Sequence, residues 1–176
     1  MPEQAAAAQQ EARYYGKYRG MVKNNEDNMK MGRLEVIVPQ VFREAKVWAL
    51  PCVPYAGKDV GFFAMPEKGT CVWIEFEAGD PSFPIWTGCS WAEGDIASSD
   101  AKPNVKFLKT KHFTLRIDDD KKEVVIEDKN GASITLRPGP QGVSIKAAKV
   151  DVETNAGASV RLAARAVSCN DIFVVS

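Results

Sequence analysis

The feature that most constrains the fold is a repeating pattern in residues 106–176. Two or three apolar residues recur there at alternate positions, in short bursts that begin roughly every 8 to 10 residues. Polar or glycine-bearing corners such as DDDKK, DKNGA and RPGPQG separate the bursts. Alternation with a period of two is typical of strands that bury one face. The pattern therefore predicts a series of short β-strands, each with one thin apolar face and no helix to cover it.

Such a thin face cannot offset the cost of ordering the chain, which is about 1–2 kcal/mol per residue for the backbone alone. A self-covering solenoid of these few rungs would leave its ends open. A monomeric sandwich is the main alternative, but sandwich cores usually carry a buried Trp or Tyr, and residues 138–176 contain neither. Three copies that wind around one axis share a core and leave no free edge along their length. We therefore expect an intertwined triple-stranded β-helix, which makes the protein a homotrimer.

The alternation also predicts which side chains face the common axis. They are the apolar members of successive bursts, so each would meet its two symmetry copies. The expected trimer core consists of Phe113, Leu115, Ile126, Ile134, Leu136, Val143, Ile145, Val152, Val160 and Leu162.

Residues 14–92 also consist of short segments broken by Gly, Pro, Asn and Asp. Residues 32–41 alternate, and Leu34, Val36 and Val38 predict a strand with one buried face, which Pro39 either limits to the edge of a sheet or ends. The two prolines in 47–56 favour an extended connection over a strand, and further strands are expected at 62–65, 71–76 and 85–91. Five or six short strands in under 80 residues indicate a closed or nearly closed antiparallel barrel.

These patterns give an all-β chain in four parts. Residues 1–13 form an N-terminal arm rich in Ala, Gln and Glu, and residues 14–92 form the barrel. Residues 93–105 are small and polar and are the predicted linker. Residues 106–176 form the trimeric β-helix.

Composition narrows the classes of partner. Lys plus Arg and Asp plus Glu number 23 each, so the formal net charge is zero and there is no electrostatic footprint for nucleic acid. The N-terminus lacks the basic start and apolar core of a signal peptide, which predicts folding in a cytoplasm. The four cysteines show no zinc-type spacing, and we expect them to be small buried residues in a reducing compartment.

The sequence offers little for catalysis. The single histidine, His112, has no identifiable nucleophile partner, and no phosphate-binding glycine motif occurs. Glu75, Glu77 and Asp80 form a cluster from which two carboxylates could serve a glycoside hydrolase. A solvated strand face with Glu75 and Glu77, followed by a turn that begins at Asp80, explains them more simply. The acidic run 118–120 lacks the ligand spacing of a calcium loop and is typical of a hairpin tip. We therefore expect no catalytic residue, no metal and no cofactor.

The strings YYGKYRGMVKNNEDNMKMGRLEVIVPQV, WALPCVPYAG and FAMPEKGTCVWIEFEAGDPSFPIWTGCSW carry a family resemblance over about residues 14–92. They resemble the baseplate central spike protein of contractile phage tails, also called baseplate assembly protein V. The same domain occurs in the valine–glycine repeat spike proteins of type VI secretion and in related injection particles. The resemblance rests on Gly32, Arg33, Val36, Val38, Pro39, Trp48, Pro51, Cys52, Trp73, Phe76, Glu77, Gly79, Asp80, Pro81 and Gly88.

The resemblance implies an oligonucleotide/oligosaccharide-binding (OB) fold that serves as a collar and not as a nucleic-acid binder. It implies a non-enzymatic spike of the virion tail baseplate, assembled in the host bacterial cytoplasm, that pierces the target envelope when the sheath contracts. The short arm and linker leave no room for a hub or lysozyme domain, so the hub is expected to be a separate protein. The tip is expected to be blunt or capped by another protein, because no histidine follows His112 to bind an iron ion.

A different class of function is the alternative. OB folds also serve as carbohydrate- or nucleic-acid-binding modules. Trp73, Trp86 and Trp91 would then stack on the ligand.

Overall fold

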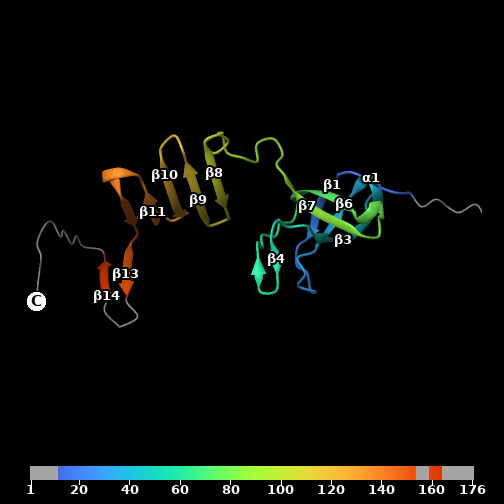
Figure 1. Ribbon diagram of the computed structural model, residues 1–176, viewed down its shortest axis with the longest axis horizontal. Coiled ribbons are helices and arrows are strands. Elements are labelled where there is room, and N and C mark those ends of the chain that lie inside the picture. Colours follow the sequence, from blue (N-terminus) through green and yellow to red (C-terminus); the bar gives the residue numbers. More distant parts are fainter. Residues whose placement is uncertain (1–11, 154–158, 164–176) are drawn as a thin grey trace, which may run out of the picture. The chain divides into compact units, whose positions relative to one another are not determined.

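The computed structural model describes residues 12–153 and 159–163. The chain divides into two compact units, Met1–Asp95 and Ile96–Ser176 (Figure 1). Strands dominate both units, and the described helices are the short turns α1 (Pro39–Phe42), η1 (Glu77–Gly79) and η2 (Gly139–Gln141). The predicted all-β class is confirmed. Within the described residues, every helix falls short of the length and hydrophobicity needed to cross a bilayer.

The first unit is built on a closed five-stranded barrel with the order β1-β2-β3-β7-β6 (Figure 1). Four of its strand pairs are antiparallel, but β3 and β7 run parallel, so the expectation of a wholly antiparallel barrel was wrong. The parallel pair arises because a long crossover, and not a hairpin, separates these two strands. The arrangement is that of an OB fold. Its strands are β1 (Tyr18–Asn24), β2 (Leu34–Ile37), β3 (Lys46–Pro51), β6 (Cys71–Phe76) and β7 (Pro84–Ser90).

The barrel core confirms the alternation seen in the sequence. Leu34, Val36 and Val38 are all fully buried. Pro39 then occupies the first position of α1, where its missing N–H leaves no helical hydrogen bond unmade. The core residues are Val22, Leu34, Val36, Val38, Ala49, Val72, Ile74, Phe76 and Trp86.

Two predictions between these strands were wrong. Residues 47–56, expected to be an extended connection and not a strand, contain most of β3, because Pro51 is the last residue of that strand and interrupts no pairing. The strand expected at 62–65 is absent, and the chain forms a small hairpin just before it instead. That hairpin pairs β4 (Ala56–Gly57) with β5 (Val60–Gly61).

The second unit contains a five-stranded antiparallel sheet in which each strand pairs with its neighbours in sequence. It confirms that each burst described by the structure is a strand. A separate hairpin follows it, formed by β13 (Lys149–Glu153) and β14 (Ser159–Ala163). The sheet strands are β8 (Val105–Lys109), β9 (Phe113–Asp118), β10 (Glu123–Asp128), β11 (Ser133–Leu136) and β12 (Val143–Lys146).

The cysteines differ from expectation. Cys52 and Cys89 are exposed and Cys71 is half-buried, so the prediction of buried residues was wrong for these three. Their thiols are free. Cys52 lies just past β3, and Cys89 lies near the end of β7, where strand pairing fixes the backbone without covering the side chain. Cys169 lies outside the described residues.

Candidate functional site

The cross-strand register of the second unit places its apolar side chains in two rows on one face of the sheet. In an antiparallel ladder, directly opposed residues project to the same face. The pairs Leu115–Ile126, Ile126–Ile134 and Ile134–Ile145 therefore extend one row across four strands. We call these two sets the apolar rows: the first is Leu108, Leu115, Ile126, Ile134 and Ile145, and the second is Ile117, Val124, Leu136 and Val143.

The apolar rows are uncovered in a single copy of the chain. Ile145 is 55% exposed, and most of the other members are exposed to a comparable degree. A contiguous apolar surface of this kind on a soluble protein marks an interaction site. In the described part of the second unit no helix packs on this face, so the apolar rows are open to cover by other molecules.

Seven residues of the predicted trimer core lie on this face and are exposed in the single chain: Phe113, Leu115, Ile126, Ile134, Leu136, Val143 and Ile145. Val152, on β13, is exposed as well. The register pairs Val152 with Val160 and Val150 with Leu162 across the hairpin, but the side chains of Val160 and Leu162 lie outside the described part of the chain. Burial of these residues between copies stays a prediction.

Sequence reasoning missed three members of the rows. Ile117 and Val124 follow the same alternation as their neighbours and were available from the pattern. Leu108 follows another apolar residue, Phe107, so the pattern did not say which of the two faces the rows. The register resolves this, because Leu108 pairs with Leu115.

The opposite face of the same sheet carries most of its polar side chains, several of them in ion pairs. Arg137 Nη2 lies 2.8 Å from a Glu123 carboxylate oxygen, and Arg116 Nη2 lies 3.6 Å from Asp118. The backbone N–H of Lys121 donates to Asp118, and this bond is the main cause that lowers the pKa of the Asp118 carboxyl. The acidic tip 118–120 therefore stabilises its own hairpin. The apolar rows lie on the other face and have no such pairs.

In the barrel, the motif residue Arg33 belongs to a cluster that the sequence did not reveal. Asp27, buried in a loop between β1 and β2, accepts bonds from Arg33 Nη2 at 2.8 Å and Nε at 3.1 Å. It also accepts bonds from the backbone N–H groups of Met29 and Met31 at 3.0 and 2.9 Å. The guanidinium lies 5.0 Å from the ring centroid of Trp48. Arg33 and Trp48 thus stabilise the barrel.

The motif after β6 is also structural. Gly79 adopts a φ of +76°, and a Cβ there would meet the ring of Tyr15 at 2.9 Å. The Gly79 carbonyl accepts a bond from Tyr14 N at 2.8 Å, and Asp80 accepts one from Ser82 N at 2.9 Å. This turn, which also contains Glu77 and Pro81, fixes the chain entry beside β6.

The other motif positions lie at ends and irregularities of strands. Gly88, at a φ of +149°, lies beside the irregularity in the β6–β7 pairing, where Trp73 opposes Gly88 and Ile74 opposes Trp86. Pro51 ends β3, and Cys52 N donates to the carbonyl of Trp86 at 2.9 Å.

The carboxylates considered for hydrolysis are engaged separately. Glu75 pairs with Lys17, and Asp80 pairs with Arg13 at 3.4 Å. Glu77 belongs to η1 and not to the strand that carries Glu75, so the two do not share a strand face as expected. Within the part of the chain that the structure describes, no group of three or more His, Cys, Asp or Glu side chains is arranged to hold a metal ion.

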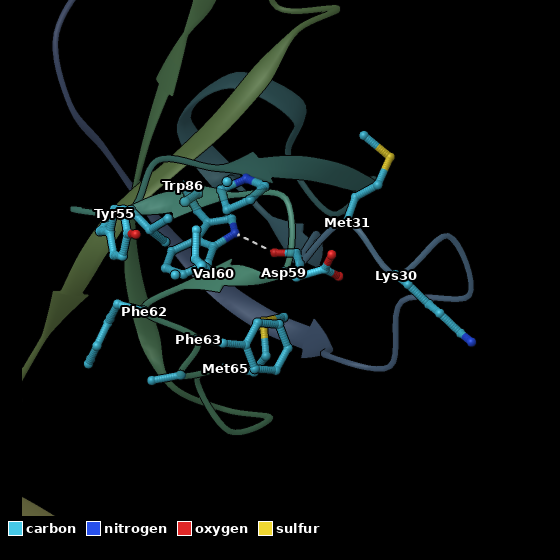
Figure 2. Close-up of a pocket in the computed structure, with 16 residues that line it drawn as sticks. Lys30, Met31, Tyr55, Asp59, Val60, Phe62, Phe63, Met65 and Trp86 are labelled. Atoms are coloured by element: carbon cyan, nitrogen blue, oxygen red, sulfur yellow. Dashed lines mark hydrogen bonds between the residues drawn. The ribbon is translucent and has the colours of Figure 1, made fainter.

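The three tryptophans of the ligand-binding alternative do not form one platform. Trp86 is one of the residues that line a pocket of about 300 Å³ beside the β4–β5 hairpin (Figure 2). Its Nε1 donates to the Gly32 carbonyl at 3.0 Å, and the residue is only 6% exposed. The Trp73 ring has the Arg19 guanidinium 4.8 Å from its centroid, and Trp91 is 71% exposed. Trp86 is therefore a core residue whose ring is almost entirely covered by the barrel.

We expect Asp27→Asn to reduce the acid sensitivity of the barrel. The bond from Arg33 is the first cause that holds the pKa of Asp27 well below its usual range. A carboxyl with a depressed native pKa stabilises the fold above its unfolded pKa of about 4, and this stabilisation is lost as the pH falls toward the native pKa. Wild-type melting temperature should therefore drop between about pH 5 and pH 2. The variant should melt lower at neutral pH and show a flatter acid limb.

Calorimetric scans across this pH range measure both effects. Asp59→Asn, which changes an exposed carboxylate in the β4–β5 turn, is the matched control and should keep the wild-type slope. An Asp27→Asn protein with an unchanged acid slope would contradict the assignment.

Comparison with known protein families gives two matches, one in each unit. Residues 18–91 match the model described as the type VI secretion system/phage-baseplate injector OB domain. Residues 104–173 match the model described as the phage baseplate V C-terminal trimerisation domain. None of the curated proteins compared with the chain matches it significantly. The second match contains all of the apolar rows, so the uncovered face lies in a segment whose relatives trimerise.

Proposed function

This chain belongs to the family of baseplate central spike proteins, and from this premise we propose that its homotrimer docks to a separate hub protein and pierces the target cell envelope. In this proposal the trimer sits at the tip of the tail tube. Sheath contraction drives tube and trimer together against the envelope, so contact with the target is transient. The particle is assembled in the cytoplasm of the host bacterium.

The uncovered apolar rows carry this proposal. They lie within the trimerisation domain, and a single chain leaves them in water. Three copies that turn these faces toward a common axis remove them from solvent at about 25 cal/mol per Å² of apolar surface. The polar faces, with their ion pairs, then lie outside. This arrangement satisfies both faces of the sheet and makes folding of the second unit depend on assembly.

The barrel and the two ends of the chain have the remaining roles. We assign docking on the hub to the barrel trimer, with residues 1–13 as an additional attachment. A separate cap protein can complete the tip. The chain acts without catalysis, metal or cofactor, and its contribution is stiffness. The ligand-binding alternative has no comparable support, because one of its three tryptophans is buried in the barrel core.

Reconstituted particles test the proposal. Particles would be assembled with the wild-type chain, with Ile145→Asp, or with Ser144→Asp as the control, and imaged by electron cryomicroscopy before a delivery assay on target cells. We expect threefold density at the end of the tube and full delivery for wild type and Ser144→Asp. Ile145→Asp particles should lack both. Normal delivery by particles without this density would refute piercing, and density elsewhere would refute hub docking.

A further inference from the structure

The segment that precedes the sheet of the second unit, residues 97–104, is held by backbone hydrogen bonds. Asp100 N and Ala101 N both donate to the carbonyl of Ala97, at 2.8 and 2.9 Å. At its other end, the carbonyl of Asn104 accepts a bond of 2.9 Å from Asp119 N, beyond β9. These bonds fix the backbone of residues 97–104, although their small polar composition predicts a flexible linker.

Asp100 anchors this segment to the sheet. It is 8% exposed, and its carboxylate accepts bonds from Lys109 Nζ at 3.2 Å and from Arg116 Nη1. The same guanidinium donates from Nη2 to the carbonyl of Ser99 at 3.2 Å. Charge-assisted bonds of this kind are among the strongest that side chains make. The Lys109 bond is the first cause that lowers the pKa of the Asp100 carboxyl, in keeping with a carboxylate that stays charged in this position.

Hydrogen bonds also fix the chain just before this segment, at residues 92–95 of the first unit. Asp95 closes a turn on Ala92, with Ala92 N 2.6 Å from an Asp95 carboxylate oxygen and Asp95 N 3.2 Å from the Ala92 carbonyl. Ala92 and Asp95 line one groove together with Lys68 and Thr70 of the barrel, so this turn belongs to the barrel surface. Ile96 is the residue between the two sets of bonds.

We propose that residues 97–104 are a clamp, anchored by Asp100, that confines the joint between the two units to the vicinity of Ile96. A flexible linker of 13 residues would let its two ends lie about 20 Å apart, since such a chain spans about 5–6 Å times the square root of its length. The clamp removes this freedom, because Asp100 holds the segment to Arg116 of β9 as well as to Lys109 of β8.

The position of the clamp is compatible with assembly of the trimer. Arg116 and Lys109 pair across the ladder with Phe107 and Thr114, and all four alternate with members of the apolar rows. The clamp therefore lies on the polar face and leaves the apolar rows free. All of its bonds are made within one chain, so assembly of the trimer need not break them.

Amide hydrogen exchange on the full chain tests the clamp. In the wild type, the amides of Asp100, Ala101 and Asp119 should exchange as slowly as those of β8. Asp100→Asn should speed exchange at these amides about ten- to a hundredfold, because it removes the charge from a buried, charge-assisted anchor. Asp119→Asn is the matched control. It removes the carboxylate that pairs with exposed Lys106 but keeps the backbone bond to Asn104, so protection of residues 97–104 should persist.

Two results would overturn the clamp. One is wild-type exchange at residues 97–104 as fast as at an unstructured peptide. The other is an equal response to Asp100→Asn and Asp119→Asn. Protection of β10 and β11 reports folding of the sheet in every sample, and mass by light scattering reports assembly. The protection of residues 97–104 does not depend on whether the protein pierces an envelope. Failure of the proposed function would therefore leave the clamp result unchanged.

Discussion

Ile145→Asp is expected to leave the protein as single copies of 19.3 kDa in solution, where the wild type has about three times that mass. Burial of an isoleucine side chain is worth about 1.5–3 kcal/mol, and each trimer would lose three of them. In addition, three carboxylates would meet at an apolar axis without partners, which costs several kcal/mol each or forces them to take up protons. We expect the combined loss to exceed the free energy that holds three such short-stranded chains together. Light scattering at micromolar concentration measures the outcome.

The control for this substitution is next to it on the same strand. Ser144 and Ile145 are both exposed in a single chain, but they project to opposite faces of β12. A carboxylate at either position is therefore tolerated within one copy. Ser144→Asp places it on the polar face and should leave the trimer intact. Equal masses for the two variants, whether both trimeric or both monomeric, would show that the apolar rows do not form the contact.

Trp86→Ala is expected to destabilise the barrel by about 3–5 kcal/mol, the usual cost of truncating a buried aromatic residue. The substitution empties part of the core and leaves the Gly32 carbonyl without the indole N–H that now donates to it at 3.0 Å. Unfolding in urea, followed by circular dichroism, measures the loss. An effect on the trimer mass is not expected, because Trp86 lies in the other unit from the apolar rows.

Trp91→Ala makes the same chemical change at an exposed side chain, and its cost should stay within about 0.5 kcal/mol. The two substitutions also test the ligand-binding alternative, in which Trp86 and Trp91 were both expected to stack on the ligand. Similar costs for the two substitutions would mean that Trp86 is not the core residue described above.

The sequence predicts local features of this fold well, and the reason is physical. Alternation identifies a strand whenever one face is buried, and Leu34, Val36 and Val38 show this in the barrel. Alternation also identifies the strands of the second unit, although Ile134 and Leu136 are exposed to solvent in the single chain. The pattern reports which face is apolar, whether the cover comes from the same chain or from another.

Contacts between residues that are distant in the sequence could not be predicted from local patterns. The parallel closure of β3 on β7 depends on the path of the crossover between them, which no local pattern specifies. Asp27 resembles any polar loop residue until Arg33 folds back on it. Asp100 likewise lies in a stretch with linker composition, and its partner Arg116 is on a strand 16 residues away. The family resemblance supplied the OB fold, but not these contacts.

The open apolar rows also have a consequence for biosynthesis. A newly synthesised copy exposes its apolar residues until two others cover them, so the yield of trimers depends on how quickly copies meet. Slow synthesis or dilution prolongs the vulnerable period and favours aggregates or proteolysis. Translation of many copies from one message, close together in space, shortens it.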